Sequence, residues 1–158
     1  MMRRSSATGE IMVVLYATEA PEQLPEAVED LIHQLTEKFE TIASVLWIVS
    51  TDYADQMIPE EKHVLHGRNY INEELNGFHY KLYFDTFFQA NSEQAEQMVA
   101  IAMEMTEMNA NMRVLDLFCG IGTFSLPFAK EAKELVGIEL VEQSILSAKE
   151  NAEKAGLT

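Results

Sequence analysis

The chain has 158 residues, 47% of them hydrophobic, and carries 26 acidic against 11 basic side chains for a net charge of −15. This size and apolar content allow one medium or two small globular domains, and the acidic balance opposes strong binding of the chain alone to nucleic acid. No apolar run reaches the roughly 20 residues that cross a bilayer, and the polar start lacks the apolar stretch of a signal peptide. We therefore expect a cytoplasmic protein without membrane contact.

The first half of the chain predicts a mixed α/β arrangement. Residues 1–9 are polar, and we expect them to be disordered. Residues 10–18 are apolar and rich in β-branched side chains, which predicts a strand. Apolar residues then recur at helical spacing over 24–39, and a second strand is predicted over 43–50. The acidic, Pro-containing stretch 52–62 is typical of a loop.

A β-hairpin is the next predicted feature. Residues 64–75 and 78–84 flank Asn76-Gly77, the pair that favours a type I′ turn because both positions need a positive φ. Apolar and polar residues alternate over 78–84, so one face of that strand should be buried. Asn91 then resembles a helix N-cap, with Gln94 completing a capping box, and the helix is predicted to end near Met108.

The last third alternates strand, helix, strand and helix, over 114–117, 123–132, 135–140 and 142–155, with Gly156 as the stop signal. This is the order of a doubly wound, Rossmann-like α/β sheet. We predict three parts in an α/β chain. Residues 1–9 are disordered, 10–90 form a mixed α/β central domain with the hairpin, and 91–158 form a partial doubly wound domain.

The run from Val114 to Thr123, with Glu139 after the next strand, is typical of a nucleotide-cofactor turn. Gly120 and Gly122 allow positive φ and close ligand approach, and the Glu139 carboxylate can accept hydrogen bonds from a ribose diol. Ser125 stands where the dinucleotide fingerprint has its third glycine, which disfavours NAD. The arrangement of Asp116 before Gly120-Ile-Gly122 and Glu139 after it resembles the S-adenosylmethionine (SAM) site of class I methyltransferases.

Two further features narrow the resemblance. Phe118 replaces the first glycine of the usual pattern, and Phe87-Phe88-Gln89-Ala90-Asn91 precedes the predicted helix. Together they are similar to the RNA 5-methyluridine methyltransferases, which methylate C5 of uridines in rRNA or tRNA. The resemblance implies SAM as cofactor, RNA as substrate, and a Gln89 amide that bonds the methionine end of SAM.

The resemblance also gives candidate roles to residues of the turn. Phe118 would wall the cofactor with its backbone and ring, and Gly120 and Glu139 would hold it. Thr123 occupies a position that is often a cofactor-contacting Asn in the family, but its hydroxyl could instead cap the following helix. Asp116 would mainly hold the glycine loop through the loop's N–H groups.

No catalytic or metal-binding residue is assigned. Cys119, the single cysteine, excludes a disulfide framework and a cysteine metal cluster, and it lies in the cofactor turn. In the family, the thiolate that adds to C6 of uracil and the proton-abstracting carboxylate belong to a region that would follow residue 158. We therefore interpret the chain as a fragment or truncated product that is inactive by itself. Its exposed strand edge predicts a homodimer or strand swap.

The resulting hypothesis is that the chain is part of a SAM-dependent RNA (uracil-5-)-methyltransferase whose RNA contacts come from the full-length protein. Two alternatives stay open from the sequence. One is another class I SAM-dependent methyltransferase, and the other is a non-catalytic SAM-binding module.

Overall fold

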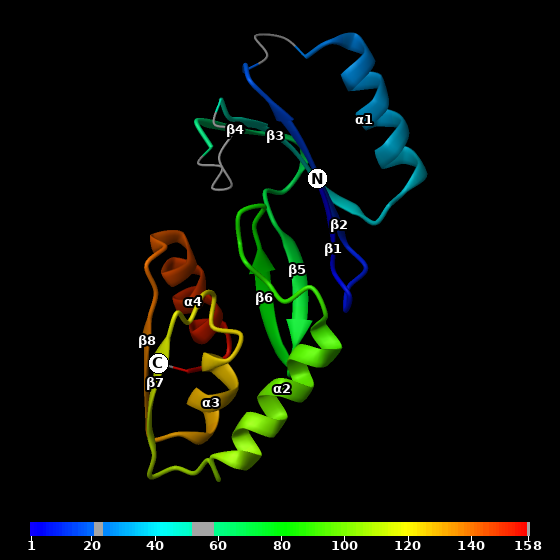
Figure 1. The fold of residues 1–158 in the computed structure, drawn as a ribbon. Helices are drawn as coiled ribbons and strands as arrows, with labels where there is room; N and C mark the ends of the chain where they lie inside the picture. The colour runs from blue at the N-terminus through cyan, green and yellow to red at the C-terminus, as the bar shows by residue number, and fades with distance from the viewer. Residues whose placement is uncertain (21–23, 52–58, 158) are drawn as a thin grey trace. The chain divides into compact units, whose positions relative to one another are not determined.

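A computed structural model describes residues 1–20, 24–51 and 59–157, which form two compact units, Met1–Asn72 and Glu73–Thr158 (Figure 1). The division lies at Asn72/Glu73 rather than at the predicted 90/91. The hairpin accounts for the difference, because its second strand packs against the last helix of the second unit. Both units contain helices and strands, and the predicted α/β class is confirmed.

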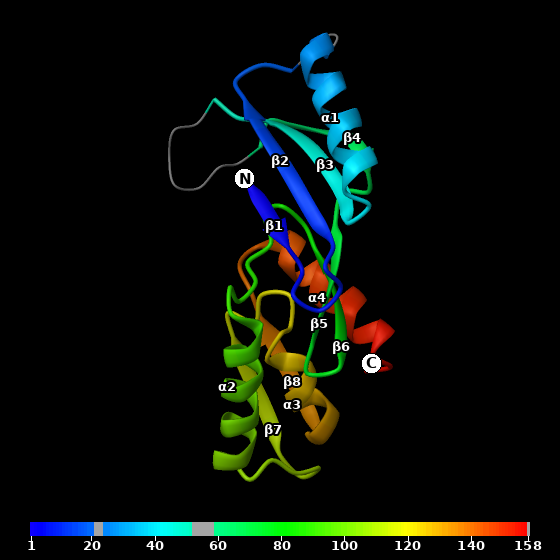
Figure 2. The same cartoon turned by 90° about the vertical axis from the view of Figure 1, so that its right-hand side faces the viewer.

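The first unit is built on a four-stranded mixed sheet in the order β1-β2-β3-β4. The β2 and β3 strands are parallel, whereas β1 and β4 run antiparallel to their neighbours. The parallel pair requires a crossover, which α1 supplies (Figure 2). The elements of this unit are β1 (Met2–Arg4), β2 (Ile11–Ala17), α1 (Glu26–Lys38), β3 (Ile42–Val49) and β4 (Glu61–Gly67).

The expectation of disorder over residues 1–9 is wrong. Met2–Arg4 pair with Ile11–Val13 as an antiparallel strand, and the Met1 amino group donates to the Val14 carbonyl at 2.8 Å. The Ser5 N–H also donates to the Glu10 carbonyl at 2.8 Å, which closes the connection between the two strands. A polar sequence is therefore ordered here because backbone pairing with a buried strand supplies the stabilisation.

The predicted hairpin arm over 64–75 divides into β4 and β5 (Ile71–Leu75), which belong to different sheets. The break follows Gly67, whose φ is +67° and where a Cβ would lie 2.2 Å from the Ala43 carbonyl oxygen. Only glycine fits this position without displacing backbone. Of the predicted loop over 52–62, residues 52–58 lie outside the described part of the chain, and β4 already begins at Glu61.

The hairpin turn is confirmed. Asn76 and Gly77 have φ values of +52° and +74°, and they connect β5 to β6 (Phe78–Leu82) in a two-stranded sheet. Both positive φ values are those that a type I′ turn requires. Tyr80 and Leu82 are buried, as the alternating pattern predicts.

The helix after the hairpin, α2 (Ser92–Met105), begins as predicted. The Asn91 side chain accepts the Gln94 N–H at 3.0 Å, which satisfies one donor of the first turn. The helix ends at Met105 rather than near Met108, and Thr106 closes it by donating its hydroxyl to the Ala102 carbonyl at 2.8 Å.

The remainder of the second unit is a β-α-β-α arrangement in which two parallel strands are joined by a helix. The strands are in register, with Leu115 opposite Val136 and Leu117 opposite Ile138. The last helix ends in a Schellman motif, since Gly156 (φ +70°) and Leu157 donate N–H groups to the Glu153 and Ala152 carbonyls. These elements are β7 (Arg113–Leu117), α3 (Ser125–Glu131), β8 (Glu134–Ile138) and α4 (Glu142–Lys154). Among the described residues, no helix has the length and apolar character needed to cross a membrane.

Candidate cofactor site

The turn after β7 has a left-handed backbone at three positions. Phe118, Gly120 and Gly122 have φ values of +65°, +56° and +91°. A positive φ is uncommon outside glycine, so Phe118 holds a conformation that its surroundings must enforce. The Phe118 and Cys119 N–H groups both donate to the Ile138 carbonyl, at 2.8 and 3.1 Å, and so fix the turn to the end of β8. The Phe118 ring is consequently directed outward and is 85% exposed.

Glu139 connects the end of β8 to the glycine turn. Its Oε2 accepts the Gly120 N–H at 3.0 Å, and its Oε1 accepts the Leu140 and Val141 N–H groups at 2.7 and 3.0 Å. The Val141 N–H, followed by those of Gly120 and Leu140, lowers the pKa of the Glu139 carboxyl against the opposing effect of burial. A carboxylate offers about four acceptor positions, so three backbone donors leave room for a further hydroxyl donor.

Asp116 has a different partner from the one predicted. Its Oδ2 accepts the Ser125 hydroxyl at 2.5 Å, and Ser125 is the buried first residue of α3. The expectation that Asp116 holds the glycine loop through the loop's N–H groups is wrong in the described structure, because Glu139 takes the Gly120 N–H. Asp116 instead fixes the start of the helix that follows the turn.

The helix begins later than predicted. It starts at Ser125 rather than Thr123, with Phe124 as the N-cap residue and no side-chain capping bond. The interpretation of Thr123 as a helix cap is therefore wrong. Among the described residues the Thr123 hydroxyl has no hydrogen-bond partner, and it remains available to a ligand.

Gln89 lies in the connection between β6 and α2. It is partly exposed, and its amide forms no hydrogen bond with another described residue. Two residues earlier, the Phe87 ring is 75% exposed. The structure thus leaves the Gln89 amide uncommitted, and its role in binding a cofactor stays a prediction.

Cys119 lies on the inner side of the turn and is 8% exposed. Burial, and then the negative charges of Asp116 and Glu139, raise the pKa of the Cys119 thiol. Its Sγ is also close to Gly137, where an added Cβ would approach to 2.9 Å. A thiol that is buried and protonated at neutral pH is a poor nucleophile, in agreement with its exclusion from the catalytic residues.

Sequence reasoning missed Asn151. Its side chain is 1% exposed, and its Nδ2 donates to the Ile121 carbonyl at 3.1 Å, within the glycine turn. The available signal was a pair of small polar residues, Ser147 and Asn151, four apart on α4, where both are buried. Ser147 donates to the Gln143 carbonyl of its own helix at 2.9 Å, whereas a buried asparagine on a helix indicates a polar partner from another element.

One cavity borders the turn, but the predicted cofactor contacts do not line it. A cavity of about 550 Å³ lies between α3, α4 and β8, and Cys119, Gly122 and Ser125 form its border with the turn. Phe118, Thr123 and Glu139 do not line this cavity. This cavity lies between the inner faces of the two helices. We therefore take the other side of the turn, which carries Phe118, Thr123 and Glu139 and is called its outer side below, as the candidate cofactor site.

A parallel β-α-β unit, a glycine turn after its first strand and a carboxylate after its second define a Rossmann-like nucleotide-cofactor fold of the methyltransferase type. A family model described as tRNA (Uracil-5-)-methyltransferase matches residues 6–158. The chain belongs to this family.

Curated relatives agree with the family. An uncharacterized RNA methyltransferase of Caldanaerobacter subterraneus subsp. tengcongensis is 35% identical over 159 residues, covering 99% of the chain and 35% of the relative. An uncharacterized RNA methyltransferase of Porphyromonas gingivalis is 35% identical over 152 residues, covering 96% of the chain and 32% of the relative. The chain thus spans about a third of the length of these relatives.

Solved structures share the fold. The Pyrococcus abyssi tRNA (uracil-54, C5)-methyltransferase in complex with S-adenosyl-L-homocysteine superposes with a TM-score of 0.73 at 27% identity, covering 99% of this chain and 36% of that one. The M. jannaschii tRNA m1G37 methyltransferase gives a TM-score of 0.55 at 22% identity, covering 92% of this chain and 41% of that one. The second likeness concerns the fold alone.

Proposed function

We propose that the chain provides the cofactor-binding part of a SAM-dependent RNA (uracil-5-)-methyltransferase. The observation that carries the proposal is the contact between Glu139 and the Gly120 N–H, which prearranges a turn and a carboxylate beside one another. Membership of the tRNA (Uracil-5-)-methyltransferase family supports SAM as the ligand of that turn. The S-adenosyl-L-homocysteine named with the Pyrococcus abyssi enzyme supports the same choice.

The residues on the outer side of the turn fit the chemistry of this cofactor. Glu139 keeps an acceptor position for a ribose hydroxyl, and Gly120 presents no side chain to an approaching ligand. The exposed Phe118 ring would offer an apolar wall. The Thr123 hydroxyl, and the Gln89 amide from the connection between β6 and α2, would bond the polar amino-acid end of the cofactor. When bound, SAM supplies an electrophilic methyl group, and the role of these residues is to hold and orient it.

The proposed acceptor is C5 of a uridine in rRNA or tRNA, and the proposed location is the cytoplasm, where these RNAs are found. The family description and the uracil C5 activity named for the Pyrococcus abyssi enzyme support this choice. C5 of uracil becomes nucleophilic only after a thiolate adds at C6. The buried Cys119 does not fit that role, so we assign no catalytic residue in this chain.

The cofactor assignment is tested by calorimetry with S-adenosylhomocysteine, using NADH as the comparison ligand. We expect saturable binding of S-adenosylhomocysteine and none of NADH. Absence of S-adenosylhomocysteine binding at millimolar concentration would contradict the proposal.

The uracil specificity is tested on the product of the whole reading frame that encodes this chain. The substrate is rRNA or tRNA labelled with tritium at C5 of uridine, together with unlabelled SAM. Methylation at C5 must release that tritium, so we expect release in step with methyl transfer. Methylated RNA that retains all of its tritium would point to another atom and contradict the proposal.

A further inference from the structure

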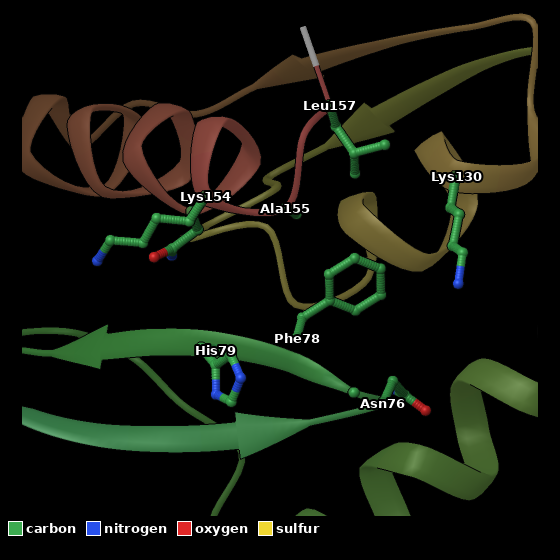
Figure 3. A pocket seen from close by; sticks show the side chains of 9 residues that line it. Asn76, Phe78, His79, Lys130, Lys154, Ala155 and Leu157 are labelled. Atoms are coloured by element: carbon green, nitrogen blue, oxygen red, sulfur yellow. The ribbon is translucent and has the colours of Figure 1, made fainter.

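A second cavity in the Glu73–Thr158 unit lies apart from the cofactor turn and is lined by an aromatic ring together with lysine and asparagine side chains. It has a volume of about 290 Å³ and lies between the hairpin turn and the C-terminal end of α4 (Figure 3). Phe78 lies near its centre, with Lys154 of α4 and Lys130 of α3 on opposite sides of the ring. Asn76, His79 and Asn151 complete its polar lining.

Two polar atoms at this cavity lack partners. The Asn76 Nδ2 donor and the Asn151 Oδ1 acceptor are both buried, and neither has a hydrogen-bond partner among the described residues. Asn151 is 1% exposed, and its Nδ2 is already held by the Ile121 carbonyl, which leaves Oδ1 as the free end of the amide. Buried polar groups in folded proteins are almost always satisfied. An occupant with both an acceptor and a donor would satisfy these two atoms.

The charges at this cavity favour an anion. Lys154 lies 3.1 Å from Glu150, but Glu150 is shared with Lys81 at 2.5 Å, so two lysines face one carboxylate. Lys130 forms no ion pair with any described residue. Among the described residues, the lining itself thus contains two lysines and no carboxylate, while Glu150 and Glu96, which accepts the Asn76 N–H at 2.9 Å, contact lining residues from outside it.

We propose that this cavity binds a single nucleotide unit. The phosphate would lie against Lys130 and accept the Asn76 amide, and a ribose hydroxyl would donate to Asn151 Oδ1. The Phe78 ring offers a face on which a base can stack. The cavity volume is near the lower end of the range for ligand sites, roughly 300 to 1,000 Å³, so one nucleotide fits rather than a longer segment.

The nucleotide could be free or part of an RNA strand, and the RNA source rests on the proposed function. Asn151 also connects the cavity to the cofactor turn, since one amide would bond the nucleotide through Oδ1 and the Ile121 carbonyl through Nδ2. In either case the bound nucleotide would lie at a place structurally linked to the turn.

The test is calorimetric titration of the full chain with UMP, with uridine, and with the trinucleotide UpUpU. Uridine lacks the phosphate and should bind much more weakly than UMP. Lys130→Gln removes one charge and should weaken UMP binding by about tenfold, the effect of losing one charge-assisted hydrogen bond. Asn76→Gly keeps the positive φ of the turn while removing the amide, and should weaken binding by roughly fivefold.

The matched control is Lys133→Gln, which removes an exposed lysine close in sequence that does not line this cavity. UMP affinity should be unchanged in this variant. The proposal is overturned if UMP fails to bind at millimolar concentration, or if Lys130→Gln and Lys133→Gln bind it equally well.

Two further measurements distinguish an RNA strand from a free nucleotide, and distinguish this proposal from the proposed function. Tighter binding of UpUpU than of UMP supports an RNA strand, whereas the reverse order supports a free nucleotide in the same site. S-adenosylhomocysteine is titrated in parallel. If S-adenosylhomocysteine does not bind to the unmodified chain, the proposed function is contradicted, whereas the UMP result still stands. If its binding is unchanged in Lys130→Gln, the two sites are separate.

Discussion

The contact of Glu139 with the glycine turn gives the most direct test of the candidate cofactor site. Glu139→Gln keeps one side-chain oxygen, which can still accept the Leu140 and Val141 N–H groups. Its amide nitrogen would face the Gly120 N–H, however, and two donors cannot bond one another. The substitution thus selectively removes the contact measured at 3.0 Å between Gly120 and the carboxylate.

The magnitude follows from that single contact. A hydrogen bond to a charged group contributes roughly 1.5 to 3 kcal/mol, and the lower end applies to a partly exposed residue. We expect the released turn to leave its binding conformation, so that restoring it on binding costs about 1.5 kcal/mol and weakens the binding of S-adenosylhomocysteine roughly tenfold. Glu139→Ala removes all three backbone contacts and the proposed ribose contact, so we expect weakening by a hundredfold or more, about 3 kcal/mol.

Calorimetry on the folded chain measures these affinities, and Glu134→Gln is the control. Glu134 is the same residue type at the opposite end of β8, where it pairs with Arg113 at 2.6 Å on the surface. We expect Glu134→Gln to leave the affinity for S-adenosylhomocysteine unchanged. Equal affinity of the Glu139→Gln variant and the unmodified chain would refute the assigned role of Glu139.

The remaining predictions concern the thiol, the packing of the turn and assembly. Since burial raises the pKa of the Cys119 thiol, its alkylation by iodoacetamide at pH 8 should be slower than in the urea-unfolded chain. The chain alone should transfer no methyl group from tritiated SAM to RNA. Rapid alkylation, or methyl transfer that Cys119→Ser abolishes, would reinstate Cys119 as a nucleophile. Gly137→Ala should lower the free energy of unfolding by roughly 1 to 3 kcal/mol through overpacking against Cys119 Sγ. Urea denaturation should show partial recovery in the double variant with Cys119→Ala, and no recovery would place the strain elsewhere. Leu115 and Leu117 are 59% and 57% exposed on β7, which pairs only with β8 among the described strands, so we expect a homodimer or strand swap by light scattering in 0.5 M salt, and a strict monomer at high micromolar concentration would contradict it.

Local chemistry made several elements predictable from the sequence alone. Asn76-Gly77 predicts the hairpin because both residues tolerate positive φ, and Asn91 predicts a helix start because its side chain can bond the Gln94 N–H. Gly156 ends α4 for the corresponding reason at a helix C-terminus. Each signal lies within a few residues of the bond that it specifies, so no knowledge of distant partners is needed.

The cofactor turn was predictable in its location but not in its hydrogen bonds. The glycines and the two acids predicted where the turn lies, because their spacing follows from the β-α-β order. Which acid bonds which group depends on how the ends of β7 and β8 meet. In the structure Glu139 accepts the Gly120 N–H and Asp116 accepts the Ser125 hydroxyl. The sequence had instead suggested that Asp116 accepts the N–H groups of the glycine loop.

Only the tertiary structure decided the features that depend on residues far apart in sequence. Residues 2–4 are ordered because β2 offers a free edge. The strand over 64–75 breaks at the positive φ of Gly67, a position where the Ala43 carbonyl leaves no space for a side chain. Asn151 reaches the Ile121 carbonyl across 30 residues. The sequence by itself determined the local elements and the family to which they belong. The boundary between the units and the partners of the buried polar groups were decided by packing, because their energies arise from contacts that no short segment contains.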